Sequence, residues 1–119
     1  MEFSFERLAA WQKSRILVKH IYRVTSFFPA SERFGLVDQL RRAAVSVSSN
    51  LAEGSGRLSV KEKIHFCEIS FGSLMEVMCQ LTLACDLGFI SEEDLAESRQ
   101  LIEELSRIIS GYRRSLFKV

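Results

Sequence analysis

Apolar residues recur at alternating spacings of three and four positions along most of the chain, and this spacing is typical of amphipathic helices. Turn-forming residues interrupt the pattern, first at Pro29 and Gly35 and later at Gly88. The pattern therefore predicts four helices, over about residues 5–28, 36–53, 60–87 and 92–116.

The ends of these helices carry residue types that favour helix termination or initiation. Gly54 and Gly56 end the second helix. Ser59, followed three residues later by Glu62, predicts a capping box at the start of the third helix. Ser91 precedes three acidic residues that complement the dipole of the fourth helix. Because short connections between long helices favour antiparallel neighbours, we predict an all-α, antiparallel up-down four-helix bundle.

Composition is compatible with a single compact unit. The 119 residues are 47% hydrophobic and contain one proline and six glycines, so we expect one domain over residues 1–119. The N-terminal segment is charged where a signal peptide needs an apolar run, and no stretch is apolar over the length of a membrane span. We therefore expect a cytoplasmic protein with no membrane partner.

Cysteine usage agrees with that expectation. Cys67, Cys79 and Cys85 all fall in the third predicted helix. Along a helix the closest two lie roughly 9 Å apart, which is too far for a disulfide within the chain. We expect reduced thiols.

Charge is distributed unevenly although the formal net charge is +1. Residues 1–63 contain eleven basic and six acidic side chains, whereas residues 64–119 contain five basic and nine acidic ones. Such asymmetry permits a polyanionic partner, because clustered cations can bind phosphates. The candidate residues for phosphate contacts form three clusters: a stripe on the first helix (Arg15, Lys19 and Arg23), the turn before the third helix (Arg57, Lys61 and Lys63), and the C-terminus (Arg113, Arg114 and Lys118).

The second predicted helix has an unusual outer face. Opposite its apolar side lie Arg42, Ser46, Ser49, Asn50 and Glu53. Serine and asparagine are mediocre helix formers, but their small side chains allow another backbone to approach closely. We interpret this face as a subunit interface; the alternative is a solvated face that gains nothing from its serines.

The third predicted helix has two apolar stripes rather than one. The second stripe includes Phe71, Met75 and Met78 and is rotated away from the first by a quarter to a third of a turn. An exposed apolar patch of this kind indicates an association surface, and these three residues join the candidate interface. The alternative is a helix that lies centrally in its own bundle.

Several segments resemble a known family, and two of them, QLRRAA at 39–44 and SNLAEG at 49–54, are fairly specific. The matching segments are residues 5–11, 28–29, 34–36, 39–44, 49–54, 57 and 72–74. They resemble the four-helix-bundle family encoded by intervening sequences within 23S ribosomal RNA genes. The accessory variability determinant of diversity-generating retroelements is similar. Ser48 stands where the family often has proline.

The resemblance has implications for assembly and partners. It implies a homopentamer of four-helix bundles, without a settled activity for the intervening-sequence members. The retroelement relatives bind RNA and a reverse transcriptase, which makes a nucleic acid or a protein the expected partner.

The sequence offers no catalytic, cofactor or metal site. A di-iron site in a bundle needs Glu-x-x-His on two helices, and we place no Asp, Glu or His at the inward positions of the first and fourth helices. His20 and His65 have no evident serine or cysteine partner for nucleophilic catalysis. The turn at Gly54 lacks the lysine of a P-loop. We therefore expect a protein that is not an enzyme.

Two functions remain open at this point. In the first, an oligomer binds RNA or DNA through basic faces repeated around a ring, so that several weak contacts add up. In the second, the protein is a scaffold for other proteins, and its basic stripes are ordinary solvated faces. The residues alone slightly favour the scaffold, and the resemblance tilts the balance to nucleic acid.

Overall fold

The computed structural model describes residues 1–118, and these residues form helices joined by short connections. The elements are a 3-10 helix η1 (Ser4–Arg7), α1 (Ala9–Thr25), a second 3-10 helix η2 (Ala30–Glu32), α2 (Leu36–Ser55), α3 (Val60–Asp86) and α4 (Glu92–Leu116). The four predicted long helices are confirmed. The first is shorter than predicted at both ends, because Leu8 is extended and separates η1 from α1, and α1 ends at Thr25 rather than at residue 28. The second is longer than predicted, because α2 continues through Gly54 to Ser55.

The N-caps predicted at Ser59 and Ser91 form as hydrogen bonds, but the capping box predicted at Ser59 is only half formed, because the Glu62 side chain does not bond back to the Ser59 backbone. The backbone N–H of Glu62 donates to Ser59 Oγ at 3.1 Å, at the start of α3. The backbone N–H of Asp94 donates to Ser91 Oγ at 3.0 Å, at the start of α4. Gly88 follows α3 with φ at +80°, a left-handed conformation that glycine adopts without strain. These local features fix where α3 begins and ends and where α4 begins.

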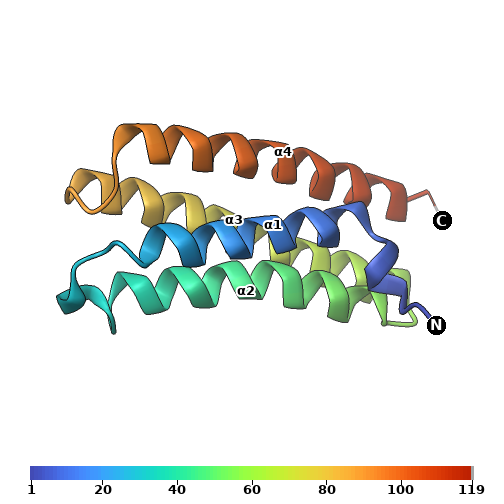
Figure 1. Cartoon of the computed structure of the whole chain (residues 1–119). Coiled ribbons are helices and arrows are strands. Elements are labelled where there is room, and N and C mark those ends of the chain that lie inside the picture. The colour runs from blue at the N-terminus through green and yellow to red at the C-terminus, as the bar shows by residue number, and fades with distance from the viewer. Residues whose placement is uncertain (119) are drawn as a thin grey trace.

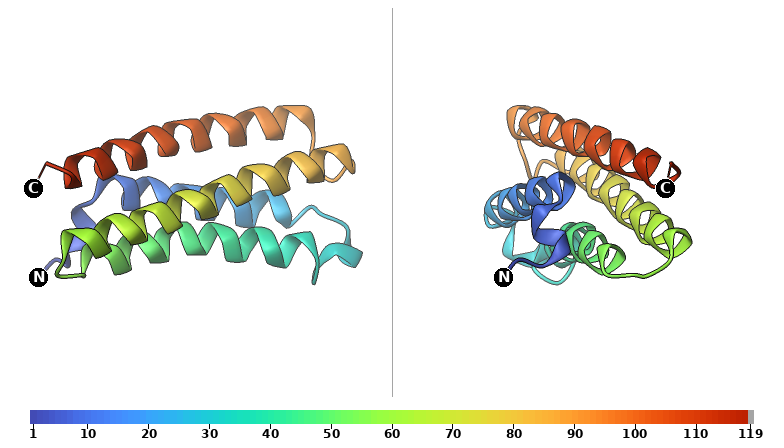
Figure 2. Two further views of the ribbon diagram at one scale, coloured as in Figure 1. Left: turned by 180° about the vertical axis from the view of Figure 1, so that it is seen from behind. Right: turned by 90° about the vertical axis from the view of Figure 1, so that its right-hand side faces the viewer.

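The four long helices pack side by side as a bundle (Figure 1). α1 contacts α2 and α4, and α3 contacts the same two helices from the other side; the contact between α2 and α3 is the most extensive. The bundle measures 46 × 24 × 22 Å, and the end-on view of Figure 2 shows the four helices around one core. As a result the N-terminus, the α2–α3 turn and the C-terminal end of α4 lie at the same end.

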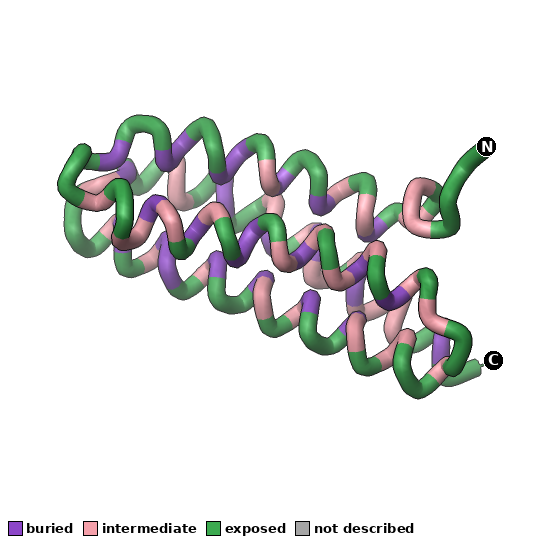
Figure 3. Tube along the Cα trace, turned by 90° about the horizontal axis from the view of Figure 1, so that it is seen from below, coloured by how far each residue is buried: buried purple, intermediate pink, exposed green. Residues whose placement is uncertain are grey.

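The core consists of aliphatic side chains from all four helices, and buried residues line the inner side of each helix (Figure 3). The largest fully buried residues include Leu17, Ile21, Leu40, Leu51, Leu74, Leu81, Leu105 and Ile109. Burying a leucine or isoleucine contributes roughly 1.5–3 kcal/mol each, so this layer drives the association of the helices.

Serine hydroxyls bond to one another or to backbone where neighbouring helices meet. Ser48 of α2 donates to Ser14 Oγ of α1 at 2.8 Å, and Ser14 is fully buried. Between α2 and α3, the Oγ atoms of Ser46 and Ser73 lie 2.8 Å apart, and Ser70 donates to a backbone carbonyl of α2 at 2.8 Å. The small serine side chains let these helices approach each other, and each of the hydroxyls named here has a hydrogen-bond partner.

None of the helices within residues 1–118 combines the length and the apolar character needed to cross a membrane.

Candidate nucleic-acid interface

Two of the basic clusters predicted from the sequence meet at one end of the bundle. Arg57, Lys61 and Lys63 belong to the α2–α3 turn and the first turn of α3. The second cluster, Arg113, Arg114 and Lys118, lies at the end of α4, and Figure 1 shows both at the end that carries the two termini. The antiparallel topology brings the two clusters together although they are far apart in the sequence.

Arg7 adds a cation that the sequence interpretation missed. The extended residue Leu8 lets η1 fold against the end of α2, where the Oγ atoms of Ser4 and Ser55 lie 3.0 Å apart. Arg7 is exposed there. We refer to this surface as the basic end, and its cations are Arg7, Arg57, Lys61, Lys63, Arg113, Arg114 and Lys118.

Some cations of the basic end already have partners within the chain. Arg57 Nη2 lies 3.0 Å from Glu53 Oε1, and Arg113 Nε lies 2.8 Å from Glu68 Oε2. Lys63 Nζ donates to a backbone carbonyl of α2 at 3.0 Å. Exposed ion pairs of this kind contribute roughly 0–1 kcal/mol, so a phosphate can replace the carboxylate at small cost.

Lys61, Arg114 and Lys118 are exposed and have no acidic partner within residues 1–118. These three cations are directly available to an anion.

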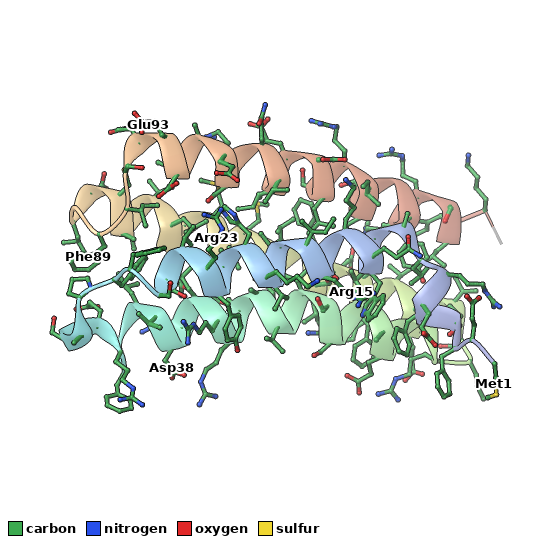
Figure 4. The ribbon with its side chains drawn as sticks, in the orientation of Figure 1. Met1, Arg15, Arg23, Asp38, Phe89 and Glu93 are labelled. Carbon is green, nitrogen blue, oxygen red and sulfur yellow. The ribbon has the colours of Figure 1, made fainter. Side chains whose placement is uncertain are left out.

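The opposite end of the bundle is acidic. Glu92, Glu93 and Asp94 form the first turn of α4, where they complement the helix dipole, and Asp86 ends α3 beside them. Figure 4 labels Glu93 at this end and Met1 at the other. Charge therefore differs between the two ends of the long axis.

The three basic residues of α1 do not share one surface. Arg23 lines a groove between α1 and α4, where its Nη2 lies 3.4 Å from Glu97 Oε1. Arg15 lines a groove between α1 and α2, and Lys19 lines both grooves. Arg15 and Arg23 lie on different sides of α1 (Figure 4). The basic residues predicted as one stripe on α1 therefore lie in two grooves, one on each side of the helix.

His20 corrects the sequence interpretation, because it points inward although no histidine was expected at the inward positions. It is 6% exposed, and its Nε2 lies 2.7 Å from Ser98 Oγ. The Ser98 hydroxyl donates to the backbone carbonyl of Asp94 at 2.8 Å, so its oxygen accepts a hydrogen bond from the N–H of His20 Nε2. On the other side, Arg23 Nη2 lies 3.2 Å from His20 Nδ1.

These bonds hold His20 as the neutral tautomer with its proton on Nε2. Burial lowers the pKa of His20 from its ordinary value, and Arg23 lowers it further, whereas Glu97 opposes the shift. The hydrogen bond between His20 and Ser98 links α1 to α4. Ser98 is fully buried and its hydroxyl donates to the Asp94 carbonyl, so it is not available as a nucleophile.

The candidate interface residues of α2 divide between two environments. Ser46 is half-buried between α2 and α3, and Asn50 Nδ2 donates to the Ser46 carbonyl at 2.8 Å. The small side chain of Ser46 therefore already serves packing within the chain. Arg42, Ser49 and Glu53 are exposed. Arg42 and Glu53 each have an ion-pair partner within the chain: Arg42 Nε lies 3.0 Å from Asp38 Oδ2, and Glu53 Oε1 lies 3.0 Å from Arg57 Nη2.

The apolar stripe of α3 also divides. Phe71 and Met78 are half-buried against the core, because α4 packs over this side of α3. Met75 remains 41% exposed. Ile69 and Leu83, which were not among the candidates, are exposed as well.

Gly72 lies among these exposed residues of α3, with nothing within 4 Å of the position its Cβ would occupy. We call Ile69, Gly72, Met75 and Leu83 the α3 outer face.

Within residues 1–118, no group of three or more His, Cys, Asp or Glu side chains is placed to hold a metal ion. A search of curated proteins found no match to the chain. The sequence model of the family described as 23S rRNA-intervening sequence protein matches residues 6–111, which is most of the chain.

Proposed function

The chain belongs to the 23S rRNA-intervening sequence protein family, and from this premise we propose that it is a non-catalytic, oligomeric four-helix bundle that binds RNA or other nucleic acid. Backbone phosphates would bind at the basic end. The resemblance to this family suggests a homopentamer, which would repeat the basic end five times.

The observation that carries the proposal is the convergence of the two basic clusters. Cations of the α2–α3 turn and of the C-terminal end of α4 occupy one end of the bundle, whereas the acidic first turn of α4 lies at the other. Such a charge separation favours one orientation of the bundle on a polyanion. Each added phosphate contact releases counterions, so binding depends on the number of free cations and on salt.

Oligomerisation is supported by the α3 outer face. Ile69, Met75 and Leu83 expose apolar surface around Gly72, which has open space beside it. A glycine in an exposed helix interior costs about 0.5–1 kcal/mol relative to alanine, and close approach of another backbone would explain its presence. Because Ser46 and Asn50 are engaged within the chain, we place the subunit contact on the α3 outer face rather than on the serines of α2.

A triple variant tests the proposal. Lys61→Gln, Arg114→Gln and Lys118→Gln remove three exposed cations of the basic end that have no acidic partner within residues 1–118, and none of them contributes to the core. Fluorescence anisotropy with a labelled structured RNA at low salt should show weaker binding by the variant. A wild-type protein that shows no binding under these conditions would refute the proposal.

A second candidate, a protein-interaction scaffold without a nucleic-acid role, is favoured by two exposed aromatic residues. Phe27 and Phe34 are 79% and 87% exposed and flank the α1–α2 connection, at the end opposite the basic end. Aromatic residues are enriched at protein–protein interfaces. If the scaffold function is correct, replacing both by serine should abolish capture of a partner, and the triple variant of the basic end should not.

A further inference from the structure

The groove between α1 and α2 carries a second group of cations that lies along the side of the bundle rather than at its end. It consists of two adjoining hollows of about 270 Å³ and 600 Å³ that share Val45. Arg15 and Lys19 of α1 line the first hollow, and Arg41 and Arg42 of α2 line the second. Two of these four residues, Arg41 and Arg42, were not considered as phosphate contacts from the sequence.

Arg41 is held in place by groups on three sides. Its Nε donates to Thr25 Oγ1 at 3.0 Å and its Nη2 to the backbone carbonyl of Tyr22 at 3.4 Å. Its guanidinium also lies over the Tyr22 ring, 4.5 Å from the ring centroid. Thr25 is only 2% exposed, and its hydroxyl donates to the Ile21 carbonyl at 2.6 Å. The buried hydroxyl is therefore fixed in the orientation that accepts from Arg41.

The half-buried guanidinium of Arg41 has no carboxylate partner within residues 1–118. The one acid that lines the groove, Asp38, is already paired with Arg42 at 3.0 Å. Arg15, Lys19 and Arg41 thus face the groove as an excess of positive charge. A guanidinium that is partly desolvated and pre-oriented, but lacks a carboxylate, is suited to bind an anion from outside.

We propose that the α1–α2 groove binds the phosphodiester backbone of a single nucleic-acid strand and that Arg41 anchors one phosphate there. Nε and one N–H of Nη2 are bonded within the chain, and the N–H groups of Nη1 and the second N–H of Nη2 match two phosphate oxygens. The immobilisation of Arg41 by Thr25 and Tyr22 reduces the entropy lost on binding. Lys19 and Arg15 extend the positive charge along α1 and contact neighbouring phosphates. This inference rests on the proposed function, and it specifies a strand on the side of the bundle in addition to phosphates at the basic end.

The test compares two double variants with the same change in charge. Lys19→Gln with Arg41→Gln removes two cations of the groove. The matched control, Arg99→Gln with Arg107→Gln, removes two exposed cations of α4 that have no ion pair within residues 1–118 and lie outside both the groove and the basic end. Fluorescence anisotropy with a labelled 15-nucleotide poly-uridine RNA, from 50 to 200 mM NaCl, gives the dependence of the binding constant on salt.

We expect the groove variant to lower the slope of log K against log salt by about 1.4, because each phosphate contact on a single strand contributes about 0.7. The control should keep the wild-type slope. Since Arg41→Gln also removes packing on Tyr22, circular dichroism should verify the fold. Lys19→Gln alone, at an exposed residue, should lower the slope by about 0.7 without affecting folding.

The outcomes separate this inference from the proposed function. If the groove variant retains the wild-type slope while the Lys61, Arg114 and Lys118 triple variant loses affinity, the groove does not bind the strand and the proposed function stands. If the groove variant and its matched control lose equal affinity, the effect is one of overall charge and the inference is wrong. If the wild-type protein binds no RNA, both are refuted.

Discussion

Gly54 of α2 faces α3 so closely that replacing it with alanine should destabilise the bundle. The residue is buried, and a Cβ at this position would lie 2.7 Å from Phe66 Cβ and 3.5 Å from the Lys63 carbonyl oxygen. The Phe66 Cβ is attached directly to the backbone of α3, so it cannot rotate away. The whole of α3 would have to shift relative to α2.

The size of the effect follows from two opposing contributions. Alanine is favoured over glycine in a helix by at most about 1 kcal/mol, and less near a helix end such as Gly54. Forcing an extra methyl group into a packed core costs about 1–3 kcal/mol. We therefore expect Gly54→Ala to lower the free energy of unfolding by about 0.5–2 kcal/mol.

Gly72→Ala is the matched control, because it makes the same substitution in the middle of α3. Within a single bundle nothing lies within 4 Å of the position of its Cβ, so only the helical preference acts at a protein concentration where the bundle is not assembled. This variant should raise the free energy of unfolding of a single bundle by about 0.5–1 kcal/mol.

Urea unfolding followed by circular dichroism at 222 nm measures both variants. Because subunit association also stabilises a folded chain, wild type and variants should be compared at a protein concentration where light scattering finds the same assembly state. A Gly54→Ala protein as stable as the wild type would show that α2 and α3 do not approach as closely as described.

Further predictions concern titration, thiol reactivity, capping and assembly. Because burial lowers the pKa of His20 below its ordinary 6.5, the unfolded chain binds more protons than the folded one as pH falls below 6.5. The free energy of unfolding should then decrease as pH falls, and part of this decrease comes from His20. Urea unfolding of His20→Gln at several pH values should show a smaller decrease than the wild type. If the free energy of unfolding of the variant decreases with pH as much as that of the wild type, His20 is not buried as described. Burial raises the pKa of Cys67 to about 11. A thiol reagent at pH 8 should therefore modify the exposed Cys79 first and Cys67 only in denaturant. Rapid reaction of Cys67 in the folded protein would refute its burial. Ser91→Ala removes the N-cap bond of α4 and should lower the free energy of unfolding by about 1 kcal/mol; an unchanged urea midpoint would show that the bond contributes nothing. Met75→Glu places a charge on the α3 outer face and should yield smaller species in light scattering at unchanged helicity, and normal assembly of this variant would rule that surface out.

Apolar spacing predicted the helices because their inner positions are filled by aliphatic side chains at regular intervals. In α4, for example, Ile102, Leu105 and Ile109 are all buried, as the alternating spacing requires. Ser59 and Ser91 were recognisable as caps because a cap depends only on residues a few positions away. Such local features can be read from one sequence.

Features that depend on a neighbouring helix could not be predicted in the same way. His20 lies beside the apolar row of α1, and only the position of Ser98 on α4 explains why it turns inward. Ser46 seemed to face outward until the approach of α3 placed Ser73 against it. Arg41 was indistinguishable from other exposed cations, because its fixed position depends on a hydroxyl of α1.

The basic end was partly predictable. Arg57 and Arg113 were each recognised as members of a basic cluster, and the up-down topology implies that these clusters share an end. Arg7 was missed because the interruption at Leu8 has no strong sequence signal, so the first helix was extended through it. A periodic pattern specifies which side of a helix is inward, but not what the outward side meets.

Ultraviolet cross-linking in the cells that make the protein tests its proposed function most directly. The tagged wild-type chain and the Lys61, Arg114 and Lys118 triple glutamine variant should be recovered in parallel, with identification of both cross-linked RNA and bound proteins. We expect RNA on the wild-type chain at a clearly higher yield than on the variant. Equal RNA recovery from the two chains, with the same proteins bound to both, would contradict nucleic-acid binding at the basic end.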